Sequence, residues 1–160
     1  MDPLEFYQHI IWPTLDDMGL RSDAACQLLL GTALVESNLE HIVQTGSGPA
    51  LGPYQMEPAT HDDIWENYLA FREHRIEGVR AHMIVQHPSA SEMKGNFYYA
   101  TAMARIHYWR VKAPLPPAGD TEAQAWYWKR WFNTFQPGET KRYQQTQIKR
   151  FVERFPEGHL

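Results

Sequence analysis

The residue best suited to chemistry is Glu36, a carboxylate between an apolar helical segment and a glycine-rich loop. Ser22 and Asp23 are residue types that begin helices. Apolar side chains then recur at three- and four-residue steps, as on the buried face of a helix: Ala25, Leu28, Leu29, Thr32 and Val35. A carboxylate at the end of such a helix is partly desolvated, which raises its pKa. The position therefore predicts a general acid that works near neutral pH.

The loop after this helix is rich in residues that cannot extend it. These residues are Gly46, Gly48, Pro49, Gly52 and Pro53. The chain must therefore turn and come back towards Glu36 before it reaches residues 54–56, Tyr-Gln-Met. We expect this loop to overhang the carboxylate.

Two short motifs in this region resemble those of a known enzyme family. The pair Glu36-Ser37, followed by Gly-Pro-Tyr-Gln-Met at 52–56, is similar to the E-S and G-L-M-Q motifs of lytic transglycosylases and goose-type lysozymes. These enzymes cut the glycan strands of bacterial peptidoglycan. The segment 125–134, AWYWKRWFNT, resembles the family's A-x-x-Y-N element, with Asn133 at the Asn position. Phe132 stands where that element has Tyr, and Pro-Tyr at 53–54 replaces Leu-Met.

The resemblance implies a role for each matching residue. Glu36 would protonate the bridging oxygen of the scissile bond, and Trp126 or Trp128 would stack on a sugar ring. The remaining substrate-binding candidates are Ser37, Tyr54, Gln55, Met56 and Asn133. Ser37 could instead support Glu36 by capping the helix end, because no base beside it suggests a nucleophile. Gln55 could equally be an ordinary loop amide.

Glycosidases commonly use two carboxylates, so we sought a partner for Glu36. The candidates that follow it are Glu57, Asp62 and Asp63, but negative charge at the start of a helix explains all three. The lack of a clear second carboxylate favours the transglycosylase pattern, in which one Glu acts first as acid and then as base. A hydrolase using one of the three stays open.

Composition bounds the class of protein. The 160 residues fit one domain, residues 1–160, and include six Trp, eight Tyr and seven Phe, an excess that suits sugar binding. Cys26 is the single cysteine and falls within the apolar helix, which predicts a buried structural thiol. The net charge of -4 argues against a nucleic-acid partner.

Targeting signals are absent from the sequence as given. Its first residues, MDPLEFYQHII, do not form a signal peptide, and no apolar run could insert into a membrane. We therefore expect synthesis in the host cytoplasm. A pore, a virion or cell lysis would then bring the protein to the cell wall.

Periodicity predicts a mostly α, single-domain fold with at most a small β-hairpin in 42–55, and the family resemblance implies that this fold is lysozyme-like. The expected helices cover 1–19 with an interruption near Pro13, 22–36, 58–71, 72–87, 93–108, 121–133 and 143–155. Capping pairs are expected at Thr60 with Asp63 and at Ser89 with Glu92. The segment 113–120 reads as a loop.

The histidines do not suggest a metal centre. His61, His74, His82 and His87 include no H-x-x-x-H pair, so solvated histidines on helix faces are expected, with no metal or other cofactor.

The sequence thus predicts a phage muralytic enzyme that cleaves the β-1,4 bond between N-acetylmuramic acid and N-acetylglucosamine. Its partners would be peptidoglycan glycan strands and, if the enzyme is carried on the virion, virion components. The alternative is a non-catalytic phage structural or adaptor protein that keeps the same scaffold.

Overall fold

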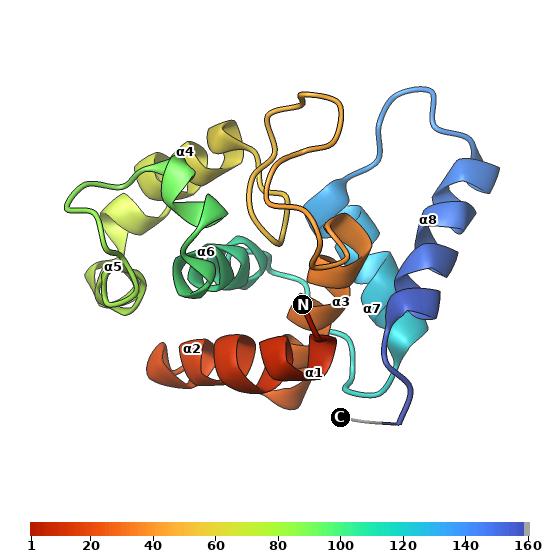
Figure 1. Ribbon diagram of the computed structural model, residues 1–160, viewed down its shortest axis with the longest axis horizontal. Coiled ribbons are helices and arrows are strands. Elements are labelled where there is room, and N and C mark those ends of the chain that lie inside the picture. The colour runs from red at the N-terminus through yellow and green to blue at the C-terminus, as the bar shows by residue number, and fades with distance from the viewer. Residues whose placement is uncertain (159–160) are drawn as a thin grey trace.

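The computed structural model describes residues 1–158 and confirms a mostly α-helical single domain (Figure 1). Its α-helices are α1 (Pro3–Phe6), α2 (Trp12–Asp17), α3 (Asp23–Glu36), α4 (Pro58–Asn67), α5 (Glu73–Arg80), α6 (Phe97–Trp109), α7 (Thr121–Trp128) and α8 (Lys141–Arg154). The π-helical turns are Tyr7–Ile11 and Lys129–Asn133, and the 3-10 turns are Leu69–Phe71 and Ala90–Lys94. Within residues 1–158, no helix is long and apolar enough to cross a membrane.

Helix α3 is the buried centre of the fold. Every residue from Ala25 to Val35 is buried, and the Ser22 side chain caps the helix by accepting from the Ala25 N–H at 3.1 Å. Helices α6, α7 and α8 all contact α3 (Figure 1). At Gly31 a Cβ atom would lie 2.1 Å from Cζ of Phe151, so only glycine lets α8 approach this closely. The packing fixes the end of α3, where Glu36 lies.

Helix α6 joins this centre to the other half of the molecule. It packs against α2, α4 and α5, and its buried alanines at 100, 102 and 104 allow close approach. The buried Arg105 donates from Nε to the Leu20 carbonyl at 3.1 Å, which ties α6 to the segment after α2.

We expected the N-terminal helical segment to be interrupted near Pro13, but the helix continues through this residue. A π-helical turn, Tyr7–Ile11, precedes α2, and Pro13 lies in the first turn of that helix. Proline is tolerated in a first turn because the N–H it lacks needs no partner there. Gly19 then ends the segment with φ of 68°, as predicted.

Neither predicted capping pair caps its helix. Helix α4 begins after Glu57 with Pro58 in its first turn and no side-chain cap. Helix α6 begins at Phe97, and Asn96 caps it by accepting from the Tyr99 N–H at 3.1 Å. The expected partners are used elsewhere, since Asp63 binds Arg110 and Glu92 accepts from backbone N–H groups.

The helices predicted over 58–71 and 72–87 are shorter than expected. The first ends at Asn67 and is followed by a 3-10 turn. The second ends at Arg80, and the N–H groups of Ile84 and Val85 bond to the Glu92 carboxylate instead of continuing the helix. Ile84 is 84% exposed, so it does not pack against the core.

The C-terminal part agrees better with the sequence. Asp120 caps α7, which continues through the π-helical turn to Asn133, the predicted end. In α8, Ile148 and Phe151 are buried, whereas Tyr143 and Val152 are exposed.

The segment predicted to hold at most a β-hairpin is an irregular loop. It contains two isolated antiparallel bridges, Val43–Leu51 and Leu51–Met56, and the described residues form no sheet. The loop rises beside the end of α3 (orange in Figure 1).

Candidate active site

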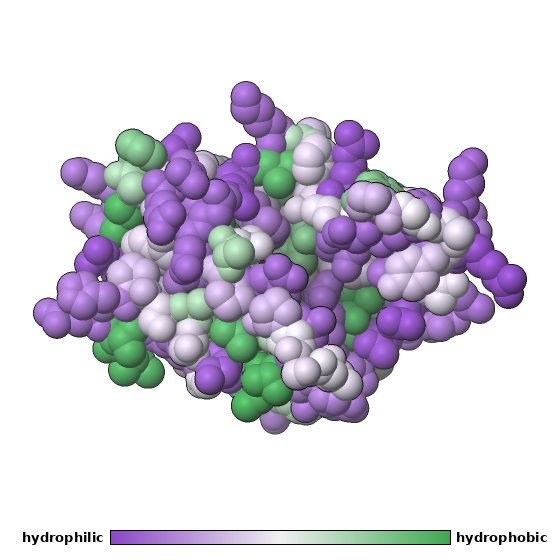
Figure 2. All heavy atoms as spheres, turned by 90° about the horizontal axis from the view of Figure 1, so that it is seen from above, coloured by the Kyte–Doolittle hydropathy of each residue, from purple (hydrophilic) through white to green (hydrophobic). Residues whose placement is uncertain are grey.

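A large open cavity of about 740 Å³ lies beside the end of α3. Its walls come from the loop after α3, the start of α4, the end of α6 and the segment from Phe132 to Gln147. Figure 2 views the molecule from above, and hydrophilic residues cover most of this face, with hydrophobic ones in small groups. Such a cavity suits a polar, extended ligand better than an apolar one.

Glu36 lines this cavity at the last residue of α3. Its Oε1 accepts from the indole N–H of Trp128 at 3.0 Å. Burial raises the pKa of Glu36 to about 7, against opposing effects from the hydrogen bonds of Trp128 and Asn133 and from the charge of Lys129. At neutral pH this carboxyl is therefore poised either to give or to take a proton.

Trp128 is not a sugar-stacking platform. It is only 2% exposed, and its ring packs against Phe151 at 5.8 Å between centroids. Its contribution to the site is the N–H that holds Glu36. Trp126 is exposed, but it does not line the cavity, so the structure leaves neither predicted tryptophan positioned to stack there.

Ser37 belongs to the framework that supports the site. Its hydroxyl donates to the Pro53 carbonyl at 2.6 Å and accepts from the Leu39 N–H at 3.1 Å, with only 1% of the residue exposed. It therefore pins the returning loop to the end of α3 and does not reach a ligand. The supporting role weighed for Ser37 fits these contacts better than substrate binding.

Tyr54 is likewise part of the framework. Its hydroxyl bonds with Oγ1 of Thr101 at 2.9 Å, and the residue is 1% exposed. The predicted contact between Tyr54 and a sugar is therefore wrong, because the side chain points into the core towards α6.

Gln55 and Met56 do line the cavity. Gln55 has φ of 49°, and its Nε2 donates to the Gly52 carbonyl at 2.9 Å, which fixes its side chain in the turn. Gly52 has φ of 74°, and a Cβ there would lie 2.4 Å from the Met93 carbonyl oxygen. This turn needs glycine and turns Gln55 towards the cavity.

Asn133 is also brought to the cavity, although it is 97 positions after Glu36 in sequence. Its Oδ1 accepts from the Lys129 ammonium at 2.8 Å, and the Asn133 amide lowers the pKa of Glu36 by hydrogen bonding. The structure thus unites Glu36, Gln55, Met56 and Asn133 in one cavity.

The other carboxylates differ from Glu36. Of the three second-carboxylate candidates, Glu57 and Asp63 line the cavity, whereas Asp62 bonds to His61 at 2.8 Å. Arg110 donates to Asp63 at 2.8 Å and holds the pKa of that carboxyl below its usual value. A further lining carboxylate, Glu139, is paired with Lys129, which also lowers its pKa.

Sequence reasoning missed Lys129, His107 and Arg110. Burial, and then the nearby Arg110, lower the pKa of His107 to about 4, so its ring is neutral and accepts from Arg110 at 3.2 Å. A charged residue inside the aromatic run 126–132 was a usable signal for Lys129. No local pattern marks His107 or Arg110, because they join the site only through packing of α6 against α4.

We found no match to this chain among protein-family models, curated proteins or solved structures. The function must therefore be argued from its own geometry. Among residues 1–158 no group of three or more His, Cys, Asp or Glu could hold a metal ion.

Proposed function

We propose that this chain is an enzyme that cleaves β-1,4-linked glycan strands of peptidoglycan, with Glu36 as its acid and base. The observation that carries the proposal is the placement of Glu36 in a large, open, polar-lined cavity, where its carboxyl accepts a hydrogen bond from the neutral indole of Trp128. The order of Glu36-Ser37, the turn at 52–56 and Asn133 along the chain resembles lytic transglycosylases.

The first chemical step would use the protonated form of Glu36. Because an indole can only donate, Oε1 is the acceptor of the Trp128 bond, and the proton of the neutral carboxyl resides on Oε2. Transfer of this proton to the bridging oxygen breaks the bond to the anomeric carbon and leaves Glu36 as a carboxylate.

The second step depends on what meets the positive charge at the anomeric carbon. Asp63 and Glu139 are each paired with a cation, so neither is a free nucleophile. This favours participation of the sugar's own acetamido oxygen. The Glu36 carboxylate then takes the proton of the 6-hydroxyl, whose oxygen attacks the anomeric carbon, displaces the acetamido oxygen from it and leaves a 1,6-anhydro muramic end.

The products of digestion test this proposal directly. Purified peptidoglycan is incubated with the protein and the fragments are analysed by mass spectrometry. We expect 1,6-anhydro ends, which weigh one water less than reducing ends. Reducing ends alone would reject the transglycosylase route and return Glu57 to consideration as a second carboxylate.

The non-catalytic alternative is tested by the same digest. A phage structural or adaptor protein on this scaffold would release no fragments at any pH, although it could still bind the walls. That outcome, seen with folded protein, would reject the enzyme proposal as a whole.

A further inference from the structure

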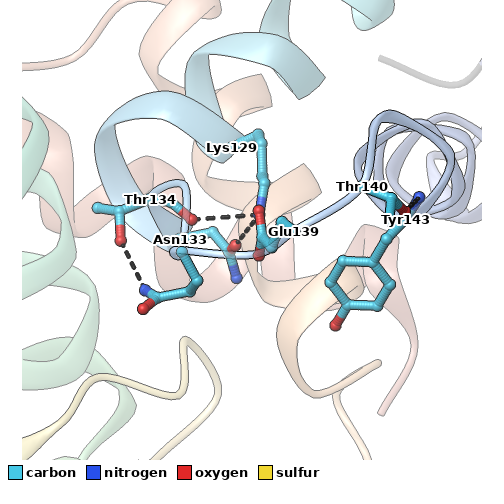
Figure 3. Close-up of polar contacts among 7 residues, drawn as sticks. Lys129, Asn133, Thr134, Glu139, Thr140 and Tyr143 are labelled. Atoms are coloured by element: carbon cyan, nitrogen blue, oxygen red, sulfur yellow. Dashed lines mark hydrogen bonds and ion pairs between the residues drawn. The ribbon is translucent and has the colours of Figure 1, made fainter.

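A buried ion pair lies at the wall of the cavity that Glu36 lines, because Glu139 and Asn133 line the same cavity. The Lys129 side chain is fully buried, and its Nζ lies 2.9 Å from Oε1 and 2.8 Å from Oε2 of Glu139. It also donates to Oδ1 of Asn133 at 2.8 Å and to the Thr134 carbonyl at 3.1 Å (Figure 3). An ammonium group has three protons, so these partners satisfy it completely.

We propose that the Lys129–Glu139 pair is a positioning device for Glu36, which fixes the Asn133 amide beside that carboxyl and balances the charge that Lys129 brings near it. The inference rests on the proposed function in so far as Glu36 is the acid. Lys129 and Glu139 act through other residues and do not touch the substrate in this scheme.

The orientation of Asn133 follows from hydrogen-bond chemistry. Lys129 can only donate, so the oxygen of the Asn133 amide must face it. The amide nitrogen is then left for Glu36, consistent with the hydrogen bond that lowers the pKa of Glu36. Without Lys129 the amide could turn over and present its oxygen to the carboxyl, which would lose a donor.

The charge balance follows from the position of the pair. The charge of Lys129 lowers the pKa of Glu36, and Glu139 is the anion paired with Lys129. Thr134 has φ of 69°, which turns the chain sharply after Asn133 and lets residues 134–139 return the Glu139 carboxylate to Lys129 (Figure 3).

Other ionisable groups also surround Glu36. Tyr108 of α6 is neutral because burial raises its pKa, and Arg154 of α8 donates to the carbonyl oxygens of Leu34 and Val35 near the end of α3. The remaining ionisable groups on the cavity walls are His41, Glu57, Asp63, His107, Arg110 and Tyr143. The variants below leave all of these unchanged.

The test is the titration of Glu36 itself, followed by carbon NMR of its carboxyl, with the spectrum of Glu36→Gln identifying the signal. Lys129→Met removes the nearby positive charge and the Asn133 anchor, so the pKa of Glu36 should rise by about 0.5 to 1 unit. Glu139→Gln leaves Lys129 charged, because Asn133, Thr134 and the new amide oxygen still accept its protons. The pKa should then fall by about the same amount.

The chain offers a matched control in an exposed ion pair of α8. Lys149 and Glu153 approach to 3.6 Å with side chains 75% and 63% exposed. Glu153→Gln makes the same charge change as Glu139→Gln, but solvent screens it, so Glu36 should titrate as in the parent.

A structural role alone would lower stability in both variants without moving the titration of Glu36 in opposite directions. Unchanged values, or shifts of the same sign, would overturn the inference. If Lys129→Met does not fold, the double variant Lys129→Met with Glu139→Gln replaces it. In the double variant the pKa of Glu36 should lie closer to the parent value than it does in Glu139→Gln. A shift as large as that in Glu139→Gln would also overturn the inference.

Activity separates this inference from the proposed function. Above the pKa of Glu36, the rate of wall digestion by Glu139→Gln should fall about tenfold for each unit by which that pKa falls. If the two variants shift the pKa of Glu36 in opposite directions but the parent protein digests no walls, the enzyme proposal is rejected and the charge balance stands. Digestion with an unmoved titration would reject only the positioning device.

Discussion

Two carboxyl groups line the same cavity, and their surroundings push their pKa values in opposite directions. Glu36 is partly buried at the cavity wall and accepts a hydrogen bond from the neutral Trp128 indole, and desolvation raises its pKa to about 7. Asp63 is half exposed and receives a hydrogen bond from the Arg110 guanidinium, and its pKa falls. The comparison shows that a cation in direct contact keeps a carboxylate ionised, whereas burial among neutral donors does not.

The helices contribute to the same contrast. Glu36 is the last residue of α3, where the aligned peptide dipoles place partial negative charge and disfavour a carboxylate. Asp63 lies in the middle of α4, away from either terminus. Position on a helix and choice of partner therefore act together in setting the pKa of Glu36 above that of Asp63.

The largest expected effect comes from removing the acid itself. Glu36→Gln keeps the shape and the Trp128 bond but has no proton to deliver, so digestion of purified walls should fall by at least about 100-fold. Circular dichroism should show an unchanged helical content. A variant that keeps most of the parent rate would remove Glu36 from the mechanism.

Some of this contrast could be predicted from the sequence and some could not. The apolar periodicity before Glu36 and the glycines after it predicted helix α3, the return of the chain at 52–56 and the partly desolvated carboxyl of Glu36. The tryptophans were assigned wrongly, because periodicity shows that an aromatic helix has buried positions but not which side chain packs against Phe151.

Contacts between distant segments were the part that local patterns could not supply. Arg110 reaches Asp63 from 47 positions away, and Trp128 reaches Glu36 from 92. Glu92 was assigned to a cap, but it binds the backbone of a loop eight residues earlier. Each of these pairings depends on how helices pack, which a single sequence does not reveal.

A second expected effect concerns stability and has a definite sign. The pKa of Glu36 is raised in the folded state, so its contribution to stability is full at low pH and is lost as the pH rises from about 4.5 through about 7. Glu36→Gln has no such loss. The unfolding free energy of Glu36→Gln minus that of the parent should therefore be larger at pH 8 than at pH 4, by up to about 3 kcal/mol.

Denaturant unfolding at the two pH values measures this difference. Asp63→Asn serves as the control, because the pKa of Asp63 is lowered from about 3.8 and its contribution to stability is lost only as the pH falls below about 4. Between pH 4 and pH 8 the difference between Asp63→Asn and the parent should therefore change little, whereas the difference for Glu36→Gln should grow. Equal responses of the two variants would show that burial does not raise the pKa of Glu36.

The third prediction concerns Gln55, which lines the cavity beside the acid. Gln55→Ala should lower the digestion rate about tenfold with a stability loss below about 1 kcal/mol, since the amide makes one bond within its own turn. Gln55→Gly is the matched variant, because glycine adopts φ of 49° without strain. If Gln55→Ala melts far below Gln55→Gly while both digest walls normally, Gln55 acts only in the turn.

The smallest expected effect sharpens the comparison from the side of Asp63. Its bridge to Arg110 is half exposed, so Asp63→Asn should reduce the unfolding free energy by about 0 to 1 kcal/mol.

The digestion rate of the parent should decline as the pH rises through about 7, where Glu36 loses its proton. Asp63→Asn should leave this decline in place, because the positive charge of Arg110 offsets the effect of the Asp63 carboxylate on Glu36. A decline displaced by a full unit in Asp63→Asn would mean that the two carboxyl groups titrate together, and the separation between acid and fixed anion would fail.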